Sequence, residues 1–184
     1  YCHALYQRVV QQLEGAGHTV DRLHLDAEGF DPVMRGADLA GYARGQSADP
    51  AVPRYQARID AAQQLVFIFP IWWEVMPALL KGFIDKVFTN GWAYKPSKHG
   101  VEGRLTHIER AVVVTTMNTP KWAYRWLYGD AVQRAFSSSP CMWISSNPGA
   151  GGVSRCARSC RSSTFWVTSN SSPRLVGLKP RPEL

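Results

Sequence analysis

The chain of 184 residues is long enough for one domain of ordinary size. Hydrophobic residues make up 45% of it and charged residues 19%, a composition that predicts a packed core and excludes global disorder. The net charge of +7 does not indicate a nucleic-acid-binding body, because residues 1–136 hold 15 basic and 13 acidic side chains whereas residues 137–184 hold 6 and 1.

The first 62 residues predict a helix, a strand, a long connection and a second helix. Apolar side chains recur at helical spacing over residues 3–14, and apolar and polar residues alternate over residues 18–25 as in a strand. Residues 26–53 are rich in Gly, Asp, Pro and Ala without a sustained period, so they predict a connection, and long loops in compact domains are often functional. Pro53 can then begin a helix that reaches about residue 62.

The next segments continue the alternation of strands and helices. The apolar run 65–69 is typical of a strand buried on both faces, and Pro77 suits the first position of a following helix. A Gly-rich stretch, 90–103, leads to a third apolar strand over residues 111–116, and a last amphipathic helix is expected over residues 121–136. This order predicts an α/β domain with an open parallel sheet over residues 1–136.

Both ends of the chain depart from this order. Domains of this class normally begin with a strand, whereas this chain begins with a helix, so we expect that the first strand lies upstream of Tyr1. Residues 137–184 are rich in Ser, Arg and Pro and show no period, so we expect an irregular tail, either a shifted reading frame after Phe136 or a natural extension. Cys156 and Cys160 in this tail lack a second pair of ligands, and no metal site is predicted.

Candidate binding residues follow the second and third strands of the chain. Ligands of open α/β sheets bind outside the carboxyl ends of the strands. Trp72 and Trp73 stand there between Pro70 and Pro77, and residues 115–120 offer hydroxyl groups and backbone amides. The paired aromatic rings favour a flat ligand, and the alternative is that they only cover the end of the sheet.

These residues resemble the signature of the flavodoxin-like NAD(P)H:quinone oxidoreductases. The block 69–94 carries the resemblance with Phe-Pro-Ile-Trp-Trp, Pro-Ala-Leu-Leu-Lys-Gly-Phe and Gly-Trp-Ala-Tyr, and residues 114–116 and 1–5 add to it. The resemblance covers about residues 1–134. It implies a flavodoxin-like open parallel sheet with helices on both faces, and the missing first strand would be central in the strand order 2-1-3-4-5. We therefore expect that the edges of both neighbouring strands are exposed.

The resemblance also implies the chemistry and the residues of the site. FAD or FMN would be held non-covalently, usually in a homodimer, and hydride would pass from NADH or NADPH to the flavin and then to a quinone-like acceptor. The residues implied to frame the flavin ring are Pro70, Ile71, Trp72, Trp73 and Glu74 on one side and Thr115, Thr116, Met117 and Asn118 on the other. Tyr1, Cys2 and Ala4 would remain of the phosphate cradle. Trp73, as part of the aromatic wall, and Tyr94, reaching towards the acceptor in the neighbouring subunit, are the implied catalytic residues.

Two other functions remain open beside this oxidoreductase. The chain could be a flavin-fold regulatory subunit of a membrane ion-efflux partner that docks through Trp122, Trp126 and Tyr128, although aromatic residues at this helical spacing more often pack in a core. It could also be a non-functional fragment of the enzyme. A cytoplasmic protein without nucleic acid is expected, and no membrane span is predicted, because the longest apolar stretch, 65–73, falls well short of the roughly 20 residues a span needs.

Overall fold

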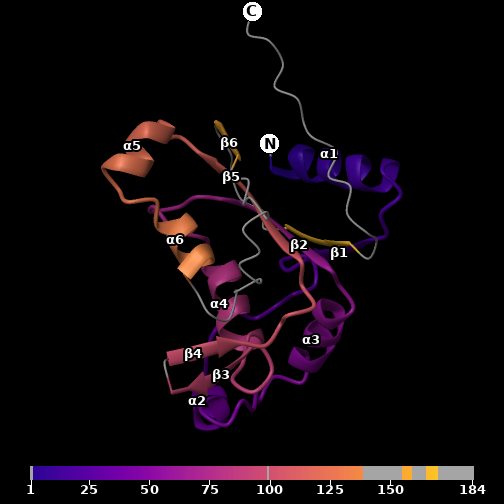
Figure 1. Cartoon of the computed structure of the whole chain (residues 1–184), viewed down its shortest axis with the longest axis vertical. Coiled ribbons are helices and arrows are strands. Elements are labelled where there is room, and N and C mark those ends of the chain that lie inside the picture. The colour runs from indigo at the N-terminus through magenta and orange to yellow at the C-terminus, as the bar shows by residue number, and fades with distance from the viewer. Residues whose placement is uncertain (1, 99, 139–154, 159–164, 170–184) are drawn as a thin grey trace, which may run out of the picture.

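The computed structural model describes residues 2–98, 100–138, 155–158 and 165–169 (Figure 1). Its helices are α1 (Cys2–Gly15), α2 (Gly36–Tyr42), α3 (Val52–Asp60), α4 (Ala78–Val87), α5 (Lys121–Trp126) and α6 (Ala131–Ser138). Its strands are β1 (Val20–His24), β2 (Gln64–Pro70), β3 (Tyr94–Ser97), β4 (Gly100–Gly103), β5 (Arg110–Met117), β6 (Arg155–Arg158) and β7 (Phe165–Ser169). Among the helices in these ranges, none has the length and apolar character to cross a membrane.

Five of the strands form one sheet in the order β1-β7-β2-β5-β6. β2, β5 and β6 are parallel, and residues 64–70 of β2 pair one to one with residues 110–116 of β5. β7 lies between β1 and β2 and runs antiparallel to both. The fold is a flavodoxin-like α/β sheet with β7 in the central position of the order 2-1-3-4-5 and β6 at its edge.

The expectation of a wholly irregular tail and exposed central edges is corrected by β6 and β7. Both strands lie within residues 137–184, and β7 pairs with β1 on one side and β2 on the other. Residues 165–168 are Phe-Trp-Val-Thr, four types with high strand propensity, which the Ser- and Arg-rich composition around them obscures. Two flanking strands with unpaired backbone groups provide the partners for such a segment. α6 also reaches into the tail as far as Ser138, and the remaining residues of the tail lie outside the described part of the chain.

Helices cover both faces of the sheet because the apolar side chains of β2 alternate between them. Val66 and Ile68 pack with apolar residues of α1 on one face. Leu65, Phe67 and Phe69 point to the opposite face, where the larger core lies beside α3 and α4 (Figure 1). This confirms the prediction of a strand buried on both faces, since every residue of β2 is buried.

Two connections contain more regular structure than the sequence predicts, and one predicted helix is divided in two. α2 lies within the expected connection 26–53, and the Gly-rich stretch 90–103 contains the β3–β4 hairpin. The expected helix over residues 121–136 is divided into α5 and α6. Gly129 and Asp130 have φ angles of 74° and 50°, and two consecutive residues in this left-handed region end the first helix.

The connection before α3 is fixed to α4 by a buried ion pair and a close backbone approach. Lys86 Nζ lies 3.0 Å from Asp49 Oδ2 and donates a hydrogen bond of 3.0 Å to the carbonyl of Asp31. A β-carbon on Gly82 would lie 2.3 Å from the carbonyl oxygen of Pro32. Glycine is therefore required at position 82 for this loop to reach the helix.

We expect Gly82→Ala to destabilise the fold, although alanine is the better helix former. The added methyl group would overlap Pro32, and overpacking of this kind costs about 1–3 kcal/mol. The free energy of unfolding from denaturant titration measures the effect. Gly36→Ala at the start of α2 is the control, because its methyl group meets no atom within 4 Å. Equal stability of the two variants would contradict the close approach.

Candidate functional site

The carboxyl ends of β2 and β5 bring the two predicted loops together. Pro70 stands opposite Thr116 in the parallel register, and the Ile71 N–H donates a 2.8 Å hydrogen bond to the carbonyl of Thr116. The first residue after β2 is thus hydrogen-bonded to the last residues of β5. Adjacency of these loops follows from parallel pairing, since equal register places both carboxyl ends at one edge of the sheet.

The loop after β2 is a tight turn with an unusual backbone. Trp72 and Val75 exchange two N–H to C=O hydrogen bonds of 3.0 Å, and the central residues Trp73 and Glu74 have φ angles of 49° and 65°. Positive φ at both central positions defines a type I′ turn, which strongly prefers Asn and Gly. Two bulky residues in this conformation carry a conformational cost of about 1–3 kcal/mol each, and such cost concentrates at functional sites.

The turn presents its polar and aromatic groups outwards. The Trp73 side chain is 97% exposed and that of Trp72 is 44% exposed. Within the described residues, the N–H groups of Trp73 and Glu74 have no hydrogen-bond acceptor, and the buried Glu74 Oε2 has no partner. The turn thus has an exposed aromatic ring, two backbone N–H groups without an acceptor in the described residues, and a buried carboxylate oxygen without a partner.

Tyr124 of α5 contacts this turn from the protein interior. Its hydroxyl donates a 2.9 Å hydrogen bond to the carbonyl of Glu74 and accepts one of 3.1 Å from the N–H of Val132. Burial raises the pKa of Tyr124, so the phenol remains protonated and able to donate at neutral pH. Sequence reasoning missed Tyr124, because nothing in the aromatic run 122–128 distinguishes this residue from its neighbours.

The predicted residues at the end of β5 divide into buried and exposed groups. Thr115, Thr116 and Met117 are buried, and Met117 belongs to the main core. Asn118 is exposed beyond the strand. The side chains of Thr115, Thr116 and Met117 therefore contribute mainly to packing, and the solvent-exposed part of this loop begins at Asn118.

The start of α1 also lies at this edge of the sheet. Cys2 is buried, and its Sγ lies 3.4 Å from Thr116 Oγ1, within hydrogen-bonding distance for sulfur. Ala4 is exposed two residues further along the helix, and Tyr1 lies outside the described residues. The positive end of a helix of 14 residues is thus placed beside the β2 and β5 loops.

Tyr94 is not brought to this edge within the chain. It begins β3, and the β3–β4 hairpin lies towards the lower end of the molecule in Figure 1, whereas α5 and β6 lie towards the upper end. Its expected role in a neighbouring subunit stays a prediction. No cluster of three or more potential metal ligands occurs in the described ranges.

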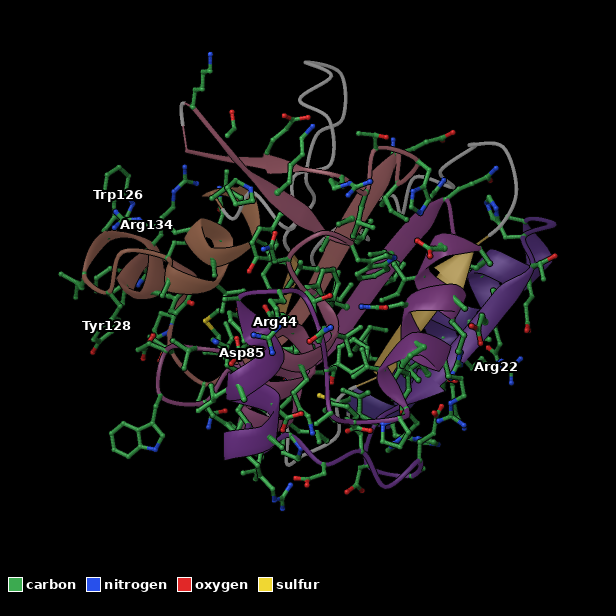
Figure 2. The ribbon with its side chains drawn as sticks, turned by 90° about the horizontal axis from the view of Figure 1, so that it is seen from below. Arg22, Arg44, Asp85, Trp126, Tyr128 and Arg134 are labelled. Carbon is green, nitrogen blue, oxygen red and sulfur yellow. The ribbon has the colours of Figure 1, made fainter. Side chains whose placement is uncertain are left out.

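Most of the aromatic residues of α5 and of the turn after it face solvent. Figure 2 shows Trp126 and Tyr128 projecting away from the body of the protein, and Trp126 is 78% exposed. Trp122 and Leu127 are also largely exposed. The expectation that aromatic residues at this spacing pack in a core is therefore wrong for Trp122 and Trp126, and only Tyr124 of this run is buried deeply.

Comparisons with known proteins place this geometry in a family. A family model described as "Flavodoxin-like fold" matches residues 1–138. NAD(P)H dehydrogenase (quinone) 1 of Cavia porcellus is 26% identical over 145 residues, covering 70% of this chain and 53% of that protein. The glutathione-regulated potassium-efflux system ancillary protein KefF of Enterobacter sp. (strain 638) is 45% identical over 49 residues, covering 27% of this chain and 28% of that protein.

A solved structure shows the same fold. A putative quinone reductase from Klebsiella pneumoniae aligns with a TM-score of 0.66 and 23% identity, covering 85% of this chain and 69% of the other. The chain spans about half the length of the first curated relatives that it matches. Since the family model covers three quarters of the residues, from the start of α1 to the end of α6, the chain belongs to the flavodoxin-like family that includes the NAD(P)H:quinone oxidoreductases.

Proposed function

We propose that the protein is a flavin-dependent NAD(P)H oxidoreductase that reduces a quinone-like acceptor. The observation that carries the proposal is the exposed, left-handed Trp73–Glu74 turn at the carboxyl ends of β2 and β5. An unpaired pair of donors beside an exposed aromatic ring suits a flat ligand with carbonyl oxygens. A cytoplasmic location belongs to the same proposal, because NADH and NADPH are available there.

The residues at this edge fit a flavin. The N–H groups of Trp73 and Glu74 would donate to the ring carbonyl oxygens, and the indole of Trp73 would form one wall of the ring site. The start of α1 at Cys2 would face the phosphate, where a helix N-terminus stabilises negative charge. The flavin, when bound, supplies the hydride chemistry, and the protein provides binding and orientation.

A homodimer is part of this proposal, since Tyr94 lies away from the site of its own chain. In a dimer, the β3–β4 hairpin of one subunit would bring its tyrosine to the acceptor bound at the other. A phenol there would contact the acceptor ring and donate a hydrogen bond to it. Tyr94→Phe would then raise the KM for the acceptor and leave flavin binding unchanged.

Titration of the purified full chain with FMN and with FAD tests the proposed function. We expect the fluorescence of FMN or of FAD to be quenched saturably as it binds the protein. The loaded protein should then oxidise NADH or NADPH only when a simple quinone is added. The chain saturated with flavin should lose this activity when the quinone is omitted under anaerobic conditions. A chain that folds cooperatively but binds neither flavin would overturn the proposal.

A second candidate function is regulation of a membrane ion-efflux partner. The exposed aromatic residues Trp122, Trp126, Leu127 and Tyr128 form a possible docking face, and the 49-residue match to the potassium-efflux ancillary protein supports this candidate. Co-sedimentation with membranes that contain such an efflux protein would distinguish it. Full quinone reductase activity without membranes, together with no co-sedimentation, would exclude it.

A further inference from the structure

Tyr124 joins the neighbouring helices α5 and α6 to the turn after β2, which is remote in the sequence. Its hydroxyl bridges the carbonyl of Glu74, in the turn after β2, and the N–H of Val132, at the start of α6. Its own carbonyl accepts a hydrogen bond of 3.1 Å from Asp130, which has a φ of 50°. The side chain of Tyr124 is thus hydrogen-bonded to the left-handed turn at Glu74, and its main-chain carbonyl is hydrogen-bonded to the second left-handed non-glycine position, Asp130.

The hydrogen bond to Glu74 acts on the conformation of the turn itself. A carbonyl group rotates with the peptide plane between residues 74 and 75, so fixing its oxygen restricts ψ of Glu74 and the orientation of the next N–H. Without this bond, the cost of positive φ at Trp73 and Glu74 favours relaxation towards ordinary turn geometry. The bond is directional and lies in a region where Tyr124 is only 3% exposed, so water does not replace it readily.

We propose that Tyr124 is a positioning residue that holds the Trp73–Glu74 turn in its left-handed form before any ligand binds. The turn N–H groups then point at the ligand site without rearrangement, which lowers the entropic cost of binding. This inference rests on the proposed flavin function for its effect on affinity. Its effect on the turn is independent of any ligand, and the two can be measured separately.

Tyr124→Phe in the full chain tests the proposal, because it removes only the hydroxyl oxygen. We expect the dissociation constant for FMN or FAD to rise roughly five- to tenfold, the usual effect of one lost hydrogen bond in a buried setting. The visible absorption band of the bound flavin should shift, since its carbonyl oxygens lose aligned donors. A dissociation constant within twofold of the original and an unchanged spectrum would overturn the proposal.

Tyr55→Phe is the matched control. Tyr55 is buried in α3, its hydroxyl accepts a hydrogen bond of 3.2 Å from Arg54, and burial raises its pKa as it does for Tyr124. Loss of its hydroxyl should lower the melting temperature without altering flavin affinity. If both variants weaken flavin binding equally, Tyr124 has only a general structural role and the proposal is wrong.

Hydrogen exchange of the flavin-free protein separates this proposal from the proposed function. In Tyr124→Phe, the amides of Trp72 and Val75 should exchange roughly tenfold faster, since they are the donors that close the turn. Tyr55→Phe should leave them unchanged. Faster exchange in a chain that binds no flavin would refute the proposed function and retain the positioning role, whereas unchanged exchange would refute the positioning role.

A double-mutant cycle with Glu74→Gly identifies the route of the effect. Glycine at the second central position of a type I′ turn removes the cost of positive φ, so the turn needs less support. We expect Tyr124→Phe to accelerate exchange of Trp72 and Val75 about twofold in this background instead of roughly tenfold. An equal effect in both backgrounds would show that Tyr124 does not act through the backbone of Glu74.

Discussion

Replacing Trp73 with alanine is expected to raise the flavin dissociation constant at least about fivefold and to leave the stability of the fold unchanged. The ring is 97% exposed, so its loss removes almost no packing, and the change in unfolding free energy should stay within about 0.5 kcal/mol. Stacking of a flat heterocycle on an aromatic side chain is worth roughly 1–3 kcal/mol, which corresponds to about fivefold to a hundredfold in affinity. Fluorescence titration and denaturant unfolding measure the two quantities.

Trp126→Ala is the appropriate control for this prediction. Trp126 is also highly exposed, at 78%, and it lies on α5, where Figure 2 shows it pointing away from the body of the protein. Its removal should change neither flavin affinity nor stability. Equal flavin affinity of the two variants would show that the exposed ring of Trp73 is not part of a cofactor site. Weaker membrane co-sedimentation in Trp126→Ala alone would support the regulatory candidate instead.

Val167→Pro should unfold the protein or leave it marginally stable. Val167 is in the middle of β7 and stands opposite Arg22 of β1 and Val66 of β2. Proline lacks the N–H group and disrupts pairing in a central strand, and each buried backbone partner left unpaired costs about 1–3 kcal/mol. Because whole domains are stable by only about 5–15 kcal/mol, this loss should be visible as a large fall in the midpoint of thermal unfolding.

Val101→Pro tests whether that effect is specific to the central position. Val101 is half exposed in β4 of the two-stranded hairpin, outside the main sheet. Its replacement should disturb only the hairpin and lower the melting temperature little. A mild effect of Val167→Pro, similar to that of Val101→Pro, would mean that β7 is not required to complete the sheet.

Patterns along single segments account for what could be predicted before the fold was known. The continuous apolar run of β2 requires cover on both faces, and the helical spacing of Leu80, Phe83 and Val87 requires one buried side of α4, so both elements were predictable. The solvent exposure of individual side chains was less predictable. Trp122 and Trp126 have the spacing of a core-facing stripe, yet they face solvent because α5 turns Ala123 and Tyr124 towards the body.

The candidate site shows the same division between local pattern and tertiary contact. The prolines and tryptophans of residues 70–77 mark a ligand loop after a strand, and parallel pairing makes its proximity to Thr116 predictable. The positive φ angles of Trp73 and Glu74 were not predictable, since both residue types avoid this region when unsupported. The support comes from Tyr124, which is 50 residues away from Glu74 in the sequence.

The sequence by itself determined the α/β class, the family and the position of the proposed ligand loop, because each depends on residue types at short spacing. Only the tertiary structure decided which segment occupies the centre of the sheet and which side chain holds the turn. β7 and Tyr124 take these places through backbone pairing and hydrogen bonds to distant residues. The free energy of such contacts depends on partners that come close only in the folded chain. Local secondary-structure propensity therefore does not predict them.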